Sequence, residues 1–472
     1  MPPPARLAAR LAARAEFDAT VAWALGIRFW QLAAAPITAL LIAGRFSETE
    51  QDYYYTIAGL LGLDALCRLG LGEVLVALTA HAYADDGTGA SGRRLAGLAR
   101  FAGRWAALSA AAFAVGVGAF GAWNLSGNAA GAGVTVGWAG PWWTAAACTA
   151  GSVAVAPALA VLLGCGRVGP VTKTQTLAAV AGNLGAWALM LFGGSLWAVA
   201  AACAGRLLVE AALIARSWPF LRALAGGDGA TFRWRTDVWP MQWRAAVQSS
   251  VAAAAAAGLT LVLFRHRDEL GAGEAGRLGM SWSAALALQY GGTAWLNTRA
   301  PRLGALAARG DRSGFDRLFA RTFFASWAAV AAGAVAGTAL VWGLNVWGVA
   351  LAERLLSPTA FGALVAGSVA LHVPLSLATY LRAWRAEAFV LPAVAIWGAV
   401  GGATWTLGPR YGAAGVAWGF LGAVALVGVP LYALRWRSVA RRLSEAATPA
   451  DPARPSGSGD AKQSSDVAEA GG

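Results

Sequence analysis

Long apolar segments follow one another along almost the whole chain and restrict its fold more than any other feature. About twelve are long enough to cross a bilayer, since a helix needs roughly 20 apolar residues to span the hydrocarbon core. The mean hydropathy is +0.54, and only 13% of the 472 residues are charged, against about one-quarter in soluble domains. The sequence therefore predicts an all-α integral membrane protein.

The expected helices form two groups of six, in two similar bundles around a central cavity. Membrane spans are expected over residues 20–43, 53–81, 100–122, 139–163, 172–193, 195–215, 243–264, 278–298, 321–343, 358–380, 389–407 and 413–434. The predicted domains are an amphipathic N-terminal segment on the cytoplasmic surface (1–19), a first bundle (20–216), a cytoplasmic connecting loop (217–240), a second bundle (241–434) and a cytoplasmic tail, basic and then disordered (435–472).

The distribution of basic residues predicts the orientation of the chain. Loops on the side of the N-terminus carry about four times as many Arg and Lys residues as the opposite loops, which by the positive-inside rule places both termini in the cytoplasm. This explains the net charge of +13, so we expect membrane lipids rather than nucleic acid as partners. The few cysteines and histidines are scattered, so we expect no metal site and no cofactor.

A weak internal repeat links the two halves. The segment LLIAGRFSETEQDYYYTIAGLLGL follows the first span, and LVLFRHRDELGAGEAGRLGMSWSAAL follows the seventh. In this alignment Glu50 corresponds to Glu274 and Asp52 to Gly276. Because six spans separate the copies, the halves have the same orientation, which predicts parallel repeats with a pathway between them.

These two loops and their flanking spans, Gly26–Leu78 and Val262–Phe323, resemble the polysaccharide flippases of O-antigen and capsule synthesis. This family belongs to the multidrug, oligosaccharidyl-lipid and polysaccharide exporter superfamily, and often shows a Leu-Gly-x-Glu-x-Gly loop after spans one and seven. The second copy fits with Glu274 and Gly276, whereas the first has Asp52 at the glycine position. The resemblance implies a bundle of twelve to fourteen helices that moves lipid-linked glycans outward by alternating access. It implies no enzymatic activity, and makes a polysaccharide polymerase or glycosyltransferases candidate partners.

Arginines inside the spans are the candidate ligands of an anionic substrate. Arg28, Arg68 and Arg206 lie within apolar segments, where a charged side chain normally faces protein or water. A guanidinium group donates bidentately to phosphate oxygens, so the three suit a diphosphate in a central cavity. The spacing also allows neutral structural pairs, Asp64 with Arg68 and Arg206 with Glu210, each four residues apart.

Other polar residues in the spans are candidates for substrate contact and coupling. The amides that could hydrogen-bond sugar hydroxyls are Gln31, Gln248, Gln289 and Asn297, although amides in membranes also join helices to each other. Coupling to an ion gradient would use Glu73, Asp64 or His372. For His372 the alternative is a structural bond near the kink expected at Pro374.

The predicted function is the flipping of an undecaprenyl-diphosphate-linked oligosaccharide from the inner to the outer leaflet of the cell (inner) membrane, for cell-surface polysaccharide synthesis. A cation-coupled small-molecule antiporter of the multidrug type is an alternative, with Glu73 as its coupling carboxylate. A polytopic glycosyltransferase that uses a prenyl-phosphate sugar is another, because Glu48, Glu50 and Asp52 occur in the first outer loop.

Overall fold

The computed structural model describes residues 22–23, 26–27, 29–84, 90–127, 136–226, 233–384 and 388–447. In these residues the chain is helical throughout and has no strand. Seven helices are long and apolar enough to cross a membrane. These observations confirm the predicted all-α membrane fold; the predicted N-terminal segment 1–19 and most of the tail lie outside the described residues.

The first bundle contains the helices up to residue 225. Its elements are the helix Phe29–Arg45, α2 (Glu48–Leu61), α3 (Asp64–Arg68), α4 (Leu71–Ala84), α5 (Ala90–Ala112), η1 (Phe113–Val117), α6 (Gly118–Ser126), α7 (Ala139–Gly164), α8 (Val168–Leu191) and α9 (Trp197–Ala225). The second bundle contains η2 (Trp234–Val238), α10 (Trp239–Arg265), α11 (Arg267–Leu270), α12 (Glu274–Ala308), α13 (Arg312–Val346), α14 (Ala350–Glu353), α15 (Pro358–Ala383), α16 (Val390–Gly422), η3 (Ala423–Gly428) and α17 (Val429–Ala447).

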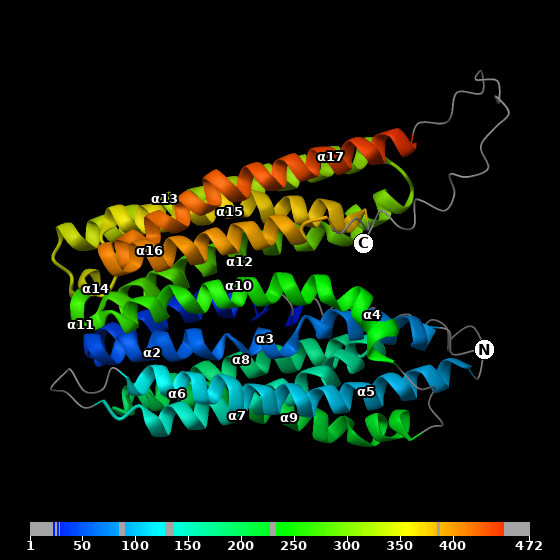
Figure 1. Ribbon diagram of the computed structural model, residues 1–472, viewed down its shortest axis with the longest axis horizontal. Coiled ribbons are helices and arrows are strands. Elements are labelled where there is room, and N and C mark those ends of the chain that lie inside the picture. Colours follow the sequence, from blue (N-terminus) through cyan, green and yellow to red (C-terminus); the bar gives the residue numbers. More distant parts are fainter. Residues whose placement is uncertain are drawn as a thin grey trace.

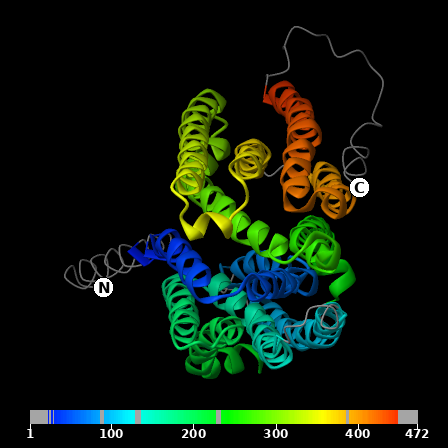
Figure 2. The ribbon, with the colours of Figure 1, turned by 90° about the vertical axis from the view of Figure 1, so that its left-hand side faces the viewer.

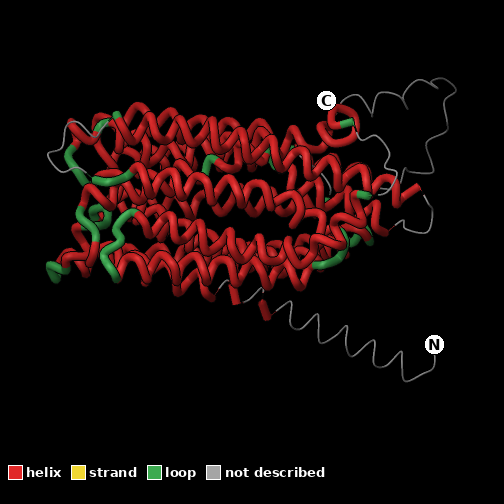
Figure 3. Tube along the Cα trace, turned by 90° about the horizontal axis from the view of Figure 1, so that it is seen from below, coloured by secondary structure: helices red, strands yellow, loops and turns green. Residues whose placement is uncertain are grey.

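The long helices of both bundles run along the same axis, and most loops lie at its two ends (Figures 1 and 3). Seen along this axis, the bundles form two groups, with α10 and α12 beside the first bundle (Figure 2). Helices α2, α11 and α14 share one end, called here the junction end, and α17 ends at the other (Figure 1). Helix α10 packs against α2 and α3 of the first bundle as well as against α12 and α16 of its own.

The second predicted span is not one continuous helix, which corrects the sequence-based expectation. The chain turns at Gly62 and Leu63, forms the short α3, and turns again where Leu69 and Gly70 both have positive φ. Glu73 therefore belongs to a different helix from Asp64 and Arg68. The break lies where α10 approaches most closely, since a Cβ on Gly70 would lie 2.7 Å from the Cβ of Ala245.

The predicted spans eleven and twelve form the two arms of a hairpin, the first within α16 and the second from the end of α16 through η3 into α17. Gly412 has φ 62° and ψ −152°, a conformation essentially restricted to glycine, and the chain reverses there at the junction end. Small residues let the arms approach: a Cβ on Gly415 would meet the Leu407 carbonyl, and one on Gly419 the Cβ of Ala403. With the two arms of this hairpin counted separately, the described helices are consistent with about twelve crossing segments.

Candidate functional site

Two predicted arginines each form an ion pair within a helix of the first bundle. Arg68 on α3 lies 2.8 Å from Asp64, and Arg206 on α9 lies 2.8 Å from Glu210. Asp64 is also close enough to Arg206 for the two charges to interact. Both pairs expected from the four-residue spacing are therefore formed, and the two pairs are called here the arginine cluster.

The two guanidinium groups keep unused donors despite these ion pairs. Arg206 contacts Glu210 through its Nε, and its side chain is 57% exposed. Arg68 contacts Asp64 through Nη2 and is 30% exposed, while its Nε is buried without a partner in the described part of the chain. A guanidinium has five N–H donors, so each arginine can accept an anionic ligand without losing its carboxylate.

The other predicted site residues on these and neighbouring helices differ in their exposure. Arg28 lies outside the described residues. Gln31 and Gln248 are half-buried on helix Phe29–Arg45 and on α10, Asn297 is exposed on α12, and Glu73 is exposed on α4.

Gln289 and His372 form a separate buried cluster inside the second bundle. Gln289 on α12 donates to the Ser368 carbonyl on α15, and its side-chain oxygen lies 3.4 Å from His372 Nδ1. On the other side of the ring, Nε2 lies 2.9 Å from the Ser326 hydroxyl on α13. Three helices are thus joined through one imidazole that is fully buried. The described partners of the His372 ring are thus side chains rather than the backbone carbonyl expected near Pro374, and its coupling role stays a prediction.

The strongest polar contacts between the bundles lie at the junction end. The carboxylate of Asp52 on α2 accepts hydrogen bonds from the backbone N–H groups of Gly273 (2.7 Å) and Gly276 (2.6 Å) at the start of α12. Gln51 donates to the carbonyl of Arg354, 3.1 Å away. Glu48 lies 3.6 Å from Arg277. Three residues of the first bundle therefore hold the second bundle.

Burial and charge oppose each other at Asp52, which precedes the predicted second span. Burial raises the pKa of this carboxyl to about 6, although its two amide hydrogen bonds and the nearby charges of Arg267 and Arg277 act to lower it. Its protonation state is consequently sensitive to the separation of the two helices.

Glycines on α12 allow the close crossing with α2. A Cβ on Gly276 would lie 2.7 Å from Gln51 Cγ, and one on Gly279 would lie 2.4 Å from both Cβ and Cγ of Tyr55. The repeat alignment pairs Asp52 with Gly276, and these equivalent positions meet at this crossing. The departure of Asp52 from the family's glycine is thus explained by its contact with the other repeat.

A second pair of equivalent residues performs the same task in each half. Glu50 accepts a hydrogen bond from the Ser195 hydroxyl (2.5 Å) just before α9, the sixth span. Glu274 accepts from the Ala413 backbone N–H (2.6 Å) at the start of the twelfth span. Each glutamate therefore connects the second span of its own half to the sixth, as expected for parallel repeats.

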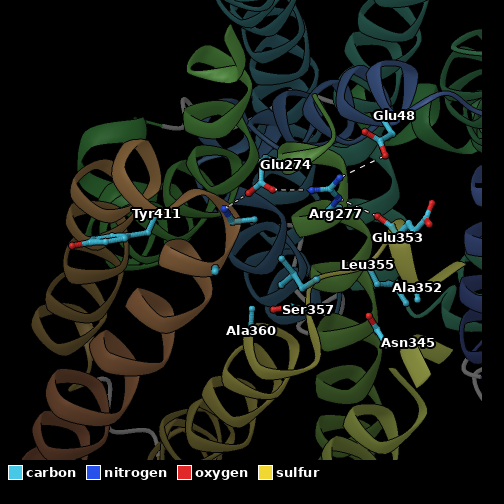
Figure 4. A pocket seen from close by; sticks show the side chains of 13 residues that line it. Glu48, Glu274, Arg277, Asn345, Ala352, Glu353, Leu355, Ser357, Ala360 and Tyr411 are labelled. Carbon is cyan, nitrogen blue, oxygen red and sulfur yellow. Dashed lines mark hydrogen bonds and ion pairs between the residues drawn. The ribbon is translucent and has the colours of Figure 1, made fainter. Parts of the chain in front are cut away.

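The sequence pointed to the junction but did not identify its residues as a site. Glu48, Gln51, Asp52 and Arg277 occur in the two repeated loops, yet their cross-bundle partners are 221 to 303 residues away in the chain. The acids that a glycosyltransferase would use there are engaged between helices. A cavity of about 440 Å³ opens beside them, between Glu48 of α2 and the second bundle (Figure 4).

Solved structures with a similar fold are transporters. A structure described as lipid II flippase MurJ in an inward closed conformation has a TM-score of 0.61 at 14% identity, over 90% of both chains. An inward-facing multidrug resistance MATE family transporter of the MOP superfamily has 0.59 at 15%, over 86% of this chain and 99% of that one. The MATE multidrug transporter DinF-BH in complex with R6G has 0.60 at 12%, over 89% and 95%.

No protein-family model and no curated protein sequence matches the chain. The structural comparisons nevertheless confirm the predicted resemblance at the level of the fold, since the polysaccharide flippases and these transporters belong to the same superfamily.

Proposed function

We propose that this multi-pass membrane protein flips an undecaprenyl-diphosphate-linked oligosaccharide from the inner to the outer leaflet. The observation that carries the proposal is the cluster of Arg68 and Arg206, whose guanidinium groups keep free donors in otherwise apolar helices of the first bundle. A planar guanidinium matches the oxygens of a phosphate group bidentately. The diphosphate would bind there while the prenyl chain stays in lipid.

The junction supports an alternating-access mechanism for this transport. In the orientation predicted by the positive-inside rule, the junction end faces outward and the termini face the cytoplasm. The bonds of Asp52, Gln51 and Glu48 then close the outer end. Opening it requires these bonds to break while the glutamate contacts within each half, at Ser195 and Ala413, can persist. Each bundle would therefore move as a unit.

The same proposal implies the membrane in which the protein acts and the proteins that would work beside it. A flippase of undecaprenyl-linked glycans acts in the cell (inner) membrane, with a lipid-linked glycan as its cargo. The glycosyltransferases that make this glycan and a polymerase that extends it would work beside the protein.

The test uses purified protein in liposomes that contain a fluorescent prenyl-diphosphate oligosaccharide. Flipping is scored by the accessibility of the dye to a membrane-impermeant quencher. We expect Arg68→Ala and Arg206→Ala to reduce the flipping rate at least tenfold, because each removes donors to the diphosphate. The matched control is Arg216→Ala, an exposed arginine ten residues further along α9, which should keep the wild-type rate. Wild-type flipping in both cluster variants would refute the assigned role.

A multidrug-type antiporter is the second candidate, because the fold matches MATE transporters about as well as the flippase. The same liposomes distinguish the two functions when they carry a cation gradient and a small fluorescent dye. Dye efflux without glycan movement would favour the antiporter, and Glu73→Gln would then test its predicted coupling role.

A further inference from the structure

The cavity at the junction end is built from both bundles. Glu48 comes from α2, whereas the other lining residues belong to the second bundle (Figure 4). Its volume of about 440 Å³ lies within the usual range for small-molecule sites. The wall is formed by α12, α13, α14, the start of α15 and the hairpin of α16.

Charges in the lining favour a cation. Glu48, Glu274 and Glu353 contribute three carboxylates, against the single guanidinium of Arg277. That guanidinium is already surrounded: Nη1 bonds Glu274 (3.0 Å), Nη2 faces Glu48 (3.6 Å), and Nε donates to the Glu353 carbonyl (3.0 Å). Its positive charge is therefore balanced by two carboxylates.

Two of the carboxylates have capacity for a ligand. Glu274 uses both oxygens, on Arg277 and on the Ala413 N–H. Glu48 has only the long ion pair with Arg277, and the Glu353 carboxylate has no partner in the part of the chain that the structure describes. Both border the cavity, so an ammonium group could bridge them.

The rest of the lining is mainly apolar. Leu355, Leu356, Ala360 and Ala414 line the cavity, and Tyr411 borders it with its ring pointing away (Figure 4). A ligand that matches both parts carries a positive charge at one end and a small apolar body at the other.

We propose that this cavity binds a small organic amine from the outer side and that binding stabilises the closed junction. The second statement follows from the origin of Glu48, which reaches the cavity only while α2 is held against α12. A ligand with higher affinity for the closed state shifts the equilibrium towards it. This effector site lies apart from the Arg68–Arg206 cluster and goes beyond the proposed cargo.

Binding is tested on purified protein, so the result does not depend on transport. The probe is dansylcadaverine, a primary amine with an aromatic body, followed by fluorescence anisotropy. Dansylglycine, which carries the same dye on a carboxylate, is the matched ligand control. We expect saturable binding of the amine only, weakened at least tenfold by Glu353→Gln and by Glu48→Gln. Glu269→Gln, an exposed residue on α11 outside the cavity, should leave the affinity unchanged.

A second variant separates lost charge from disturbed folding. Asn345→Trp would fill the cavity from α13 without changing its charge, and should also abolish binding. Equal binding of both dyes, wild-type affinity in Glu353→Gln, or displacement of the amine by micromolar Mg²⁺ would each overturn the proposal, the last by identifying a metal site.

Coupling to the junction has its own measurement. Spin labels at Arg45→Cys and Asp268→Cys, exposed residues of the two bundles at this end, report its opening by double electron–electron resonance. Saturating dansylcadaverine should increase the closed population at least threefold. Binding that leaves the distance distribution unchanged would refute the coupling. Absence of amine binding would leave the flippase proposal standing, and failure of flipping would not affect this site.

Discussion

The crossing of α2 and α12 provides the sharpest test of the junction. In Gly279→Ala the new Cβ would lie 2.4 Å from Tyr55 Cβ and Cγ. The Tyr55 Cβ is fixed to its backbone, so a rotamer change cannot relieve the overlap. Because carbon atoms pack at about 3.5–4.0 Å, the two helices must separate by roughly 1 Å or more at this point.

The energetic cost follows from that overlap. Overpacking a close-packed site costs about 1–3 kcal/mol, and it applies only while the junction is closed. The same displacement would lengthen the Asp52 bonds to Gly273 and Gly276, now 2.7 and 2.6 Å. The closed-to-open ratio should therefore fall by roughly five- to 150-fold.

The assay is double electron–electron resonance with labels at Arg45→Cys and Asp268→Cys, after replacement of the four native cysteines. Gly291→Ala is the matched control, because this glycine lies on the same helix and a Cβ there would meet nothing within 4 Å. Only Gly279→Ala should lengthen the distance. If both variants keep the wild-type distribution, the crossing does not control the junction.

Three further predictions concern the same end of the molecule. Since burial raises the pKa of Asp52 to about 6 from 3.8, proton binding favours the closed junction. The stabilisation of the closed junction by this proton is complete below the ordinary pKa of 3.8 and is lost as the pH rises through about 6. The closed-to-open ratio, measured by the same resonance experiment, should therefore increase about tenfold when the pH is lowered from 7.5 to 5. Asp52→Asn should remove this pH dependence, and its persistence would implicate another group. A disulfide between Gln51→Cys and Gly276→Cys should stop flipping until a reductant is added. The two positions are close enough, since a Cβ on Gly276 would lie 3.1 Å from Gln51 Cβ, slightly below the usual disulfide Cβ–Cβ distance of about 3.5–4.5 Å. Flipping by the oxidised protein would show that the junction need not open. Gly412→Ala should lower the melting temperature for two reasons. Alanine at φ 62° and ψ −152° costs about 1–3 kcal/mol, and its Cβ would lie 2.4 Å from Glu274 Oε2. An unchanged melting temperature would contradict this reasoning.

Local ion pairs were predictable from the sequence because both partners lie one helical turn apart. Asp64–Arg68 and Arg206–Glu210 form as their spacing suggested. Their spacing did not indicate how exposed each side chain would be: Arg206 is 57% exposed and Glu210 only 4%. The predicted position of Glu73 relative to Arg68 was wrong. It assumed one continuous helix, whereas the helix is interrupted at Leu69 and Gly70.

By itself the sequence predicted the all-α membrane fold and its approximate number of crossing segments, because hydropathy is a property of short stretches of chain. Only the tertiary structure decided what closes the junction and which residues surround the cavity beside it. Asp52 meets Gly273 across 221 residues, and Gln51 meets Arg354 across 303. Such contacts depend on how two bundles dock, and the glycines that permit the approach look like any others in a glycine-rich chain. The physical reason is that docking is fixed by shape and by buried hydrogen bonds between distant segments, which no local pattern encodes.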